Sequence, residues 1–244
     1  MQKQLSIIIA TFNAEKEIRN CLNSIVPQLS DECELIVIDG GSVDGTNVII
    51  ASYGNSITYT ISEPDKGIYD AWNKGVKAAK GEWILFIGAD DCLLPNALNS
   101  YLSILPQYRN FDFISAKLNY LDDRNKIVAV VGKEWNYKRC RLNMDVTHVA
   151  SLTNINYFRR IGLFNTDYKI CGDYELLLRG GNSMKAGFNP NIVANMKIGG
   201  VSFSIKGLKE QFAIKHKVGN VSIILCCFIF LFQVFLFYTY KLRH

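Results

Sequence analysis

The sequence predicts an α/β fold in which a mainly parallel, Rossmann-like sheet is flanked by helices. Short apolar runs rich in Ile, Val and Leu alternate with helical stretches through the first hundred residues, which is the pattern of a parallel sheet. At 244 residues, with 49% hydrophobic and 20% charged residues, the chain suits one large domain with an appendage. The same composition excludes a disordered or fibrous protein.

The first predicted strand covers residues 5–10, and Thr11, Phe12 and Asn13 end it. Residues 15–29 follow, with apolar side chains at helical spacing. Three more strands then alternate with two more helices. The strands are 34–39, 57–62 and 83–87, and the helices are 46–53 and 67–79.

After residue 100 this alternation weakens. Two strands, 111–120 and 126–131, are predicted on either side of a turn at residues 122–125. Helices are predicted farther on, at 154–161, at 174–179 and at the basic, amphipathic stretch 206–217.

Residues 218–240 contain no charged residue and would be apolar on all sides of a helix. At about 1.5 Å of rise per residue, such a helix would extend about 30 Å, the thickness of the hydrocarbon core of a bilayer. The segment therefore predicts a C-terminal hydrophobic helix that associates with a membrane. The alternative is a helix buried in an oligomer interface.

The net charge of +5 is unevenly distributed. Residues 1–100 carry 7 Lys or Arg and 13 Asp or Glu, whereas residues 101–244 carry 20 and 9. A basic second half suits an anionic partner such as a phospholipid headgroup, a phosphorylated substrate or a nucleic acid, or else it is a solvated face. The acidic first half argues against nucleic acid as a partner, and no nucleic-acid-binding motif is recognisable.

The chain has 7 Cys, and no two of them have CxxC spacing. Neither a disulfide framework nor a zinc site is indicated, which favours a reducing compartment. The first apolar run is too short for the core of a signal peptide, so we expect the N-terminus to stay in the cytoplasm.

Polar side chains follow three of the predicted strands, at the sheet edge where open α/β folds bind their ligands. Thr11 and Asn13 follow the first strand, Asp39 the second, and Asp90 and Asp91 the fourth. Neighbouring side chains of an extended chain point to opposite sides, so Asp90 and Asp91 are expected to serve two targets, a divalent cation and a ribose diol. The alternative for any single aspartate is a helix cap or a turn.

Five segments resemble the family 2 inverting glycosyltransferases in their order and spacing. The resemblance covers residues 4–205, which is most of the chain. Its segments are Ser6 to Asn13, Glu34 to Thr46, Ser62 to Gly75, Gly88 to Asp91 and Cys171 to Arg179. It implies a GT-A type fold and a nucleotide-sugar donor.

The resemblance also implies a role for each polar residue on the donor side. Thr11 and Asn13 would line the nucleotide pocket, and Asp39 would hold the base. Asp65 would contact the donor, and Asp90 would approach the ribose or the sugar.

By the same resemblance, Asp91 would ligate Mg²⁺ or Mn²⁺ on the diphosphate. Asp173 would be the general base that takes the proton of the acceptor hydroxyl. His148 and Arg179 are candidates for the acceptor site, although an isolated histidine is more often a structural hydrogen-bonding residue.

Three positions depart from the family pattern. Gly88 stands where many members have Asn or an acidic residue, and Gly172 precedes Asp173 where an acidic residue is common. Trp72 stands where many members have Arg. What neutralises the diphosphate beyond the metal is therefore open.

The sequence thus predicts an inverting, metal-dependent, hexosyltransferase-type glycosyltransferase. By the same resemblance, the expected donor is a UDP-sugar, and the expected acceptor is a hydroxyl of a polyprenyl-diphosphate-linked glycan in bacterial surface polysaccharide biosynthesis. Two alternatives remain at this point. A nucleotidyltransferase would show a Gly-rich basic loop after the first strand, which is missing here; a membrane-tethered, non-catalytic nucleotide-sugar-binding protein would lack Asp91 or Asp173, and both are present.

The predicted domain organisation has three parts, the first of which has two halves. Residues 1–205 form the catalytic domain, with a nucleotide-sugar half at about 1–100 and an acceptor half at about 101–205. The basic helix 206–217 and the hydrophobic segment 218–240 follow, and they are expected to attach the enzyme to the cytoplasmic face of the plasma membrane.

Overall fold

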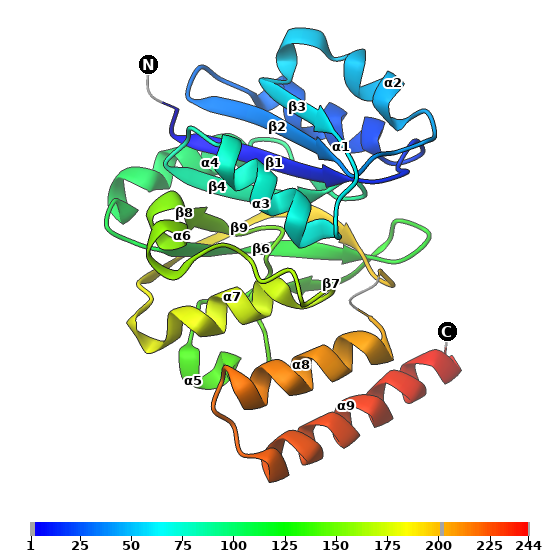
Figure 1. Cartoon of the computed structure of the whole chain (residues 1–244), viewed down its shortest axis with the longest axis vertical. Coiled ribbons are helices and arrows are strands. Elements are labelled where there is room, and N and C mark those ends of the chain that lie inside the picture. The colour runs from blue at the N-terminus through cyan, green and yellow to red at the C-terminus, as the bar shows by residue number, and fades with distance from the viewer. Residues whose placement is uncertain (1–2, 201–202, 244) are drawn as a thin grey trace.

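The computed structural model describes residues 3–200 and 203–243, with side chains up to residue 239. Residues 1, 2, 201 and 202 of the predicted catalytic domain lie outside this range. Strands and helices alternate through the first half of the chain, as the sequence predicts (Figure 1). They are β1 (Leu5–Thr11), α1 (Ile18–Ile25), β2 (Cys33–Asp39), α2 (Thr46–Ala51), β3 (Tyr59–Ser62), α3 (Ile68–Ala78) and β4 (Trp83–Gly88).

These four strands form a parallel sheet in the order β3-β2-β1-β4. The central strand β1 is buried on both faces: Ile7 and Ile9 pack under α1 and α4 (Ala97–Ile104), and Ile8 packs under α3. Gly75 lets α3 come this close, because a Cβ at that position would lie 2.4 Å from Cγ2 of Ile8.

The second half of the chain extends the same sheet with a different pattern. Its strands are β5 (Cys92–Leu93), β6 (Phe113–Leu121), β7 (Ile127–Val131), β8 (Leu152–Asn154) and β9 (Ala186–Lys197), and its helices include α5 (Tyr137–Cys140), α6 (Ile155–Ile161) and α7 (Gly172–Gly180). The long strand β9 lies parallel to β6, and the sequence pattern did not predict it.

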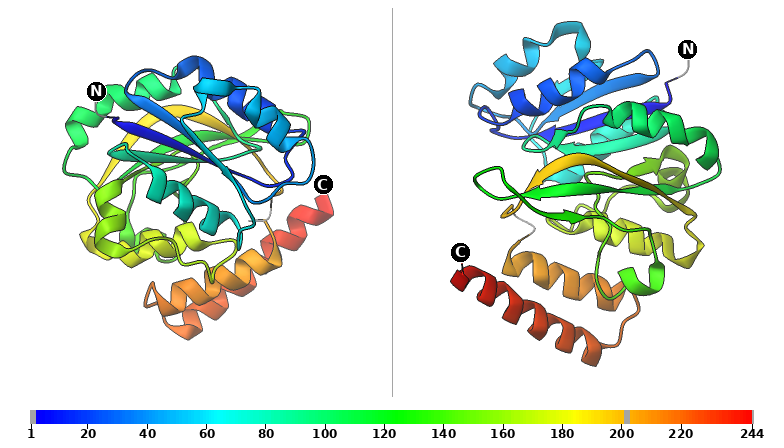
Figure 2. Two further views of the ribbon diagram at one scale, coloured as in Figure 1. Left: turned by 45° about the horizontal axis from the view of Figure 1, so that its top comes forward. Right: turned by 180° about the vertical axis from the view of Figure 1, so that it is seen from behind.

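The expectation of a mainly parallel sheet is therefore correct for β1 to β4 and for the pair of β6 and β9, and wrong for the other pairings of the second half. There β8 runs antiparallel to both β4 and β6, and β7 runs antiparallel to β6. The short turn between β6 and β7 allows only an antiparallel pairing, because parallel neighbours need a long crossover connection. The whole is a mixed nine-stranded sheet with helices on both faces (Figure 2).

Two helices follow the sheet, α8 (Ile205–Lys217) and α9 (Ile223–Arg243). Figures 1 and 2 show α8 between α7 and α9, with α9 on the outside. The helix predicted for 218–240 begins only at Ile223, because residues 218–222 turn the chain back and Asn220 has a φ of 51°. Over the part of the chain that the structure describes, no helix is both long and apolar enough to cross a membrane.

Candidate active site

The carboxyl ends of β1, β2 and β4 lie side by side, as the sequence predicts. Thr11 at the end of β1 is in register with Asp39 at the end of β2, and Ala10 is in register with Gly88 at the end of β4. The loops that follow these strands therefore form one edge of the sheet, and they carry the predicted donor-side residues.

Asp39 is fully buried and organises the loop that follows β2. Its Oδ2 accepts hydrogen bonds from the Ser42 amide at 2.9 Å, the Asn47 side chain at 2.9 Å and the Ser62 hydroxyl at 2.5 Å. Burial alone would raise the pKa of Asp39, but the hydrogen bonds from Ser42, Ser62 and Asn47 outweigh burial and lower it. Asp39 is therefore an ionised anchor at the donor edge.

Asn13 joins the first loop to the second. Its side-chain Oδ1 accepts a hydrogen bond from the backbone amide of Val43 at 3.0 Å, and its backbone amide donates to the Ser42 hydroxyl at 2.7 Å. Asn13 has a φ of 47°, a left-handed conformation that Asn tolerates better than most residues. Thr11 is buried beside it, and its hydroxyl has no hydrogen-bond partner among the described residues.

Asp65 reaches the same edge from the loop before α3. Its Oδ2 lies 2.6 Å from the point where a Cβ on Gly40 would stand, directly after Asp39. Its Oδ1 accepts from the Gly67 amide at 2.8 Å. The structure thus brings Asp65 next to the end of β2, where the sequence predicts a donor contact.

Asp90 and Asp91 do not point to opposite sides, so that expectation is wrong. Residues 89–90 form a turn instead of continuing the strand, and both carboxylates fold back over Gly88. A Cβ on Gly88 would lie 2.8 Å from Oδ1 of Asp90 and 3.0 Å from Oδ2 of Asp91. Glycine at position 88 therefore makes room for two carboxylates that face one place.

Asp91 is buried and has little to stabilise its charge. Its Oδ2 accepts one hydrogen bond, from the Gly88 amide at 3.2 Å. Burial and then the charge of Asp90 raise the pKa of Asp91 to about 8, against the small opposing effect of the Gly88 amide. A carboxylate in this state would gain more from a nearby cation than an exposed one would.

An oxygen-only donor set of this kind fits Mg²⁺ or Mn²⁺. Mg²⁺ is usually held by one or two carboxylates and completes its shell with phosphate oxygens and water. Among the described residues, no group of three or more His, Cys, Asp or Glu is placed to hold a metal ion. A metal here would therefore depend on the diphosphate of a bound nucleotide for its other ligands.

Asp173 lies in the first turn of α7 and is partly buried. The Tyr69 hydroxyl, on α3, lies 3.0 Å from Asp173 Oδ1 and 2.7 Å from the carbonyl oxygen of Ile170, so its single proton faces two acceptors. Burial and the charge of Asp173 raise the pKa of Tyr69 well above its usual value, so Tyr69 keeps that proton. The sequence did not single out this tyrosine.

The structure explains why glycine stands at position 172, where many family members have an acidic residue. A Cβ at this position would lie 2.9 Å from the ring carbons Cδ2 and Cε2 of Tyr69. The ring is held on its other sides by Trp72 and Phe164, each with a ring-centroid distance of 5.5 Å. A side chain at 172 would push Tyr69 away from Asp173.

Tyr120 on β6 is affected by the charges of both Asp173 and Asp91. Burial, then the charge of Asp173, then the charge of Asp91 raise the pKa of this tyrosine. Both carboxylates are therefore within electrostatic reach of one side chain, although they are 82 positions apart in the sequence. Only the folded sheet reveals this neighbour, because no spacing in the sequence relates 120 to 91 and 173.

His148 is buried in an aromatic cluster. Its ring stacks on Phe86 at 5.1 Å and lies 5.1 Å from Trp72. Burial lowers the pKa of His148, although the charge of Asp173 acts in the opposite direction, so the imidazole is neutral. Neither ring nitrogen has a hydrogen-bond partner among the described residues.

Arg179 is engaged at the other end of α7. Its guanidinium donates to the carbonyl oxygens of Ile161 and Leu163, each at 2.8 Å, and to Glu175 at 2.9 Å. These bonds tie α7 to the end of α6 two turns away from Asp173. The structure therefore does not bring Arg179 to the carboxylates, and its predicted acceptor role has no geometric support here.

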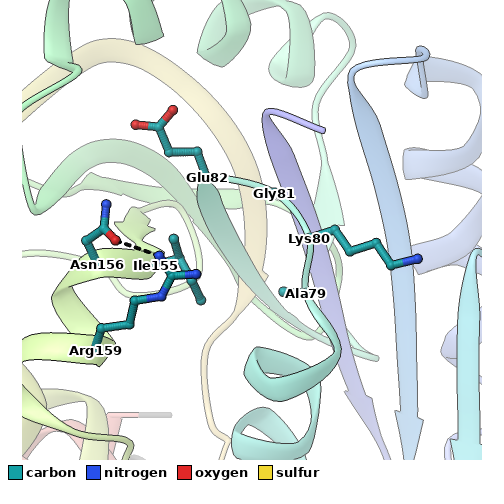
Figure 3. A pocket seen from close by; sticks show the side chains of 7 residues that line it. All are labelled: Ala79, Lys80, Gly81, Glu82, Ile155, Asn156 and Arg159. Atoms are coloured by element: carbon teal, nitrogen blue, oxygen red, sulfur yellow. Dashed lines mark hydrogen bonds between the residues drawn. The ribbon is translucent and has the colours of Figure 1, made fainter. Parts of the chain in front are cut away.

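A cavity of about 270 Å³ opens at the opposite edge of the sheet, by the start of β4 (Figure 3). Arg159 lines the cavity and donates a hydrogen bond to the side-chain oxygen of Asn156 at 2.8 Å. The other lining residues are Ala79, Lys80, Gly81, Glu82 and Ile155. None of the predicted site residues lines this cavity.

Comparison with known proteins agrees with this geometry. The model of the family "Glycosyl transferase family 2" matches residues 6–162. A PGL/p-HBAD biosynthesis glycosyltransferase of Mycobacterium bovis is 29% identical over 179 residues, covering 71% of this chain and 68% of that protein. An uncharacterized glycosyltransferase of Rickettsia typhi is 30% identical over 181 residues, covering 70% of this chain and 57% of the other.

Solved structures share the fold at low sequence identity. TarS of S. aureus superposes with a TM-score of 0.68 and 18% identity over 95% of this chain, which spans only 43% of TarS. The mannosyltransferase PcManGT of Pyrobaculum calidifontis, in complex with GDP-Man and Mn²⁺, has a TM-score of 0.65 and 16% identity over 91% of this chain and 66% of its own. From its five sequence segments, its matching family model and its GT-A fold, the chain belongs to glycosyl transferase family 2.

Proposed function

We propose that this glycosyltransferase moves one sugar from a UDP-sugar to a hydroxyl of a polyprenyl-diphosphate-linked glycan, with inversion at the anomeric carbon. The observation that carries the proposal is the meeting of two sets of carboxylates at one sheet edge. Asp173 lies 3.0 Å from the hydroxyl of Tyr69, in the first turn of α3. Helix α3 begins just beyond the ends of β2 and β3, so a donor held at this edge would lie near the base. Nucleotide sugars are bound by fold neighbours, namely UDP-GlcNAc by TarS and GDP-Man by PcManGT.

Asp91, helped by Asp90, would hold Mg²⁺ or Mn²⁺ together with the diphosphate. When bound, such an ion stabilises the negative charge that develops on the leaving diphosphate. The turn at residues 89–90 and the absence of a side chain at Gly88 keep both carboxylates facing one place before the donor arrives.

Asp173 would accept the proton of the acceptor hydroxyl, which is a poor nucleophile without a base in hydrogen-bond reach. The Tyr69 hydroxyl holds one oxygen of Asp173, which leaves Oδ2 for the acceptor. Once Asp173 has taken the proton, it is neutral and accepts a weaker hydrogen bond from Tyr69. The Tyr69 hydroxyl can then donate to its second acceptor, the Ile170 carbonyl.

Calorimetry with UDP-, GDP- and dTDP-sugars tests the donor class and the metal together. We expect UDP-sugars to bind most tightly, and only when Mn²⁺ or Mg²⁺ is present, because the metal and the diphosphate supply each other's ligands. Binding of no nucleotide sugar, with or without metal, would contradict the transferase proposal. Tight binding of a GDP- or dTDP-sugar alone would change the donor class and leave the reaction type standing.

We propose further that α8 and α9 hold the enzyme at the cytoplasmic face of a membrane. The described part of α9 exposes a row of large apolar side chains, which a lipid surface would cover: Ile223, Ile224, Leu225, Phe228, Leu231, Phe232, Phe235, Leu236 and Tyr238. Lys206, Lys209 and Lys217 are exposed or near the surface of the preceding helix, where they would meet anionic headgroups at roughly 1 kcal/mol each.

Vesicle flotation tests this attachment. The full chain is expected to float with anionic vesicles at both low and high salt, because apolar contacts resist screening. A chain that ends at Lys217 is expected to bind vesicles weakly and only at low salt, to be more soluble and to keep nucleotide binding. If the full chain stays in the soluble fraction at both salt concentrations, the apolar row of α9 contacts protein and not lipid.

A further inference from the structure

The three backbone N–H groups just before α7 all point at one carboxylate. Glu210 on α8 accepts from the amides of Lys169, Ile170 and Cys171, each at 2.9 Å. Successive N–H groups in this arrangement form a concave anion site, and here a side chain 39 or more positions away fills it. These are charge-assisted bonds, which are about twice as strong as neutral ones.

This carboxylate replaces a local cap that α7 lacks. The residue at the start of the helix is Cys171, whose side chain makes no capping hydrogen bond, whereas Ser, Thr, Asp or Asn would normally make one. A negative group beside a helix N-terminus is also favoured by the helix dipole. The start of α7 is therefore defined from outside, by α8.

The peptide group between Ile170 and Cys171 is also held by Tyr69, the residue that contacts the base. Its N–H, from Cys171, donates to Glu210, and its carbonyl, from Ile170, lies 2.7 Å from the Tyr69 hydroxyl, which also contacts Asp173. A connected path thus runs from Glu210 through Ile170 and Tyr69 to Asp173. Shifting the peptide at 170 would move both the backbone before Asp173 and its hydroxyl partner.

Packing around Glu210 keeps α8 in place. Ile214, one turn farther along α8, is fully buried against Cys171, Tyr174 and Leu178 of the α7 region. Behind it, Lys215 is buried and donates to Gln211 at 3.3 Å and to Gln233 of α9 at 3.2 Å. The helices expected to serve attachment therefore also support the start of α7.

We propose that Glu210 is a positioning residue for the general base: its carboxylate fixes the peptides of residues 169–171 and, through them, the place of Asp173. This inference rests on the proposed function, because it takes Asp173 as the base. Glu210 lies on α8, whereas the donor-side carboxylates lie at the end of β2 and in the loops after β3 and β4, so its effect should fall mainly on the base.

The test uses the full chain and three variants: Glu210→Ala, Glu210→Gln and the control Glu134→Gln, at an exposed glutamate before α5. Donor hydrolysis measures kcat and KM without a known acceptor, because water takes the acceptor's place. The donors are UDP-glucose, UDP-GlcNAc and GDP-mannose. Amide hydrogen exchange of residues 169–173 directly measures how firmly Glu210 holds the backbone amides of residues 169–171.

Glu210→Ala is expected to speed exchange of the 169–171 amides by roughly 10- to 100-fold, because each loses a charged acceptor. It should lower kcat by roughly 10- to 100-fold through misplacement of the base, while the donor KM stays within about twofold. Glu210→Gln keeps one carbonyl oxygen and should fall between, and Glu134→Gln should match wild type.

Faster exchange with an unchanged kcat would overturn the proposal and reduce Glu210 to a structural cap. A raised donor KM with an unchanged kcat would also overturn it. If Glu210→Ala does not fold, the Gln variant decides by the same two measurements. If the wild-type chain turns over none of the three donors, the proposed function fails. A difference between wild type and the Glu210 variants, by contrast, reports on Glu210 itself.

Discussion

Asp91→Ala is expected to abolish turnover and to remove metal-dependent binding of the nucleotide sugar. Asp91 is the buried member of the carboxylate pair over Gly88, and we place the metal on it. Few other protein ligands are at hand, so the loss should not be compensated. The measurements are donor hydrolysis at saturating donor and calorimetry with and without Mn²⁺, with Asp123→Ala at an exposed turn as the control. Undiminished turnover in Asp91→Ala would refute the assignment.

The raised pKa of Asp91 gives this prediction a pH dependence. The folded chain holds a proton on Asp91 up to pH of about 8, whereas the unfolded chain releases it near the usual value of 3.8. Without metal, the stability that Asp91 contributes therefore falls as the pH rises between these two values. Asp91→Asn cannot ionise, so the gain in its Tm over wild type should grow from pH 5 to pH 8 and shrink when Mn²⁺ and nucleotide are added to both.

Asp173→Asn is expected to lower kcat by about 10²–10⁴-fold, the usual contribution of a general base. Nucleotide and metal binding should stay normal, because Asp173 lies on α7 and the donor-side carboxylates lie on the ends of β2 and β4. Steady-state kinetics and calorimetry on the same preparation separate these effects. Asp167→Asn, at an exposed position of the loop before α7, is the matched control.

Two other outcomes would reassign Asp173. If Asp173→Asn loses donor affinity, the residue belongs to the donor site and not to the acceptor side. If the variant loses little activity, Asp173 serves only the start of α7, because Asn stabilises a helix N-terminus about as well as Asp does.

The donor half of the site could largely be predicted from the sequence. Strands β1, β2 and β4 are short, apolar and separated by helices, and parallel strands necessarily bring their ends to one edge. Thr11, Asp39 and Asp91 are found there. The predicted directions of the Asp90 and Asp91 side chains are wrong, because the alternation of an extended strand does not apply to residues 89–90, which form a turn.

The acceptor half was less predictable. Strand β9 contains Pro and several Asn and does not alternate cleanly, so its pattern does not predict a strand. It forms because β6 offers a parallel partner and β5 an antiparallel one. Arg179 belongs to a recognisable segment, yet its guanidinium is bound to carbonyls of α6 and the following loop. A motif identifies a segment, and it does not say which way each side chain in it points.

By itself, the sequence determined the family, the parallel first half of the sheet and the edge at which the aspartates gather, because these depend on local periodicity and on the order of motifs. Only the tertiary structure decided how Asp173 is held. Tyr69, 104 positions before Asp173, contacts it through one hydrogen bond. Glu210, on a helix beyond β9, acts on it only through the backbone amides of the residues before α7. Such contacts leave no periodic pattern in a sequence, since they depend on where helices α3, α7 and α8 come to lie against one another.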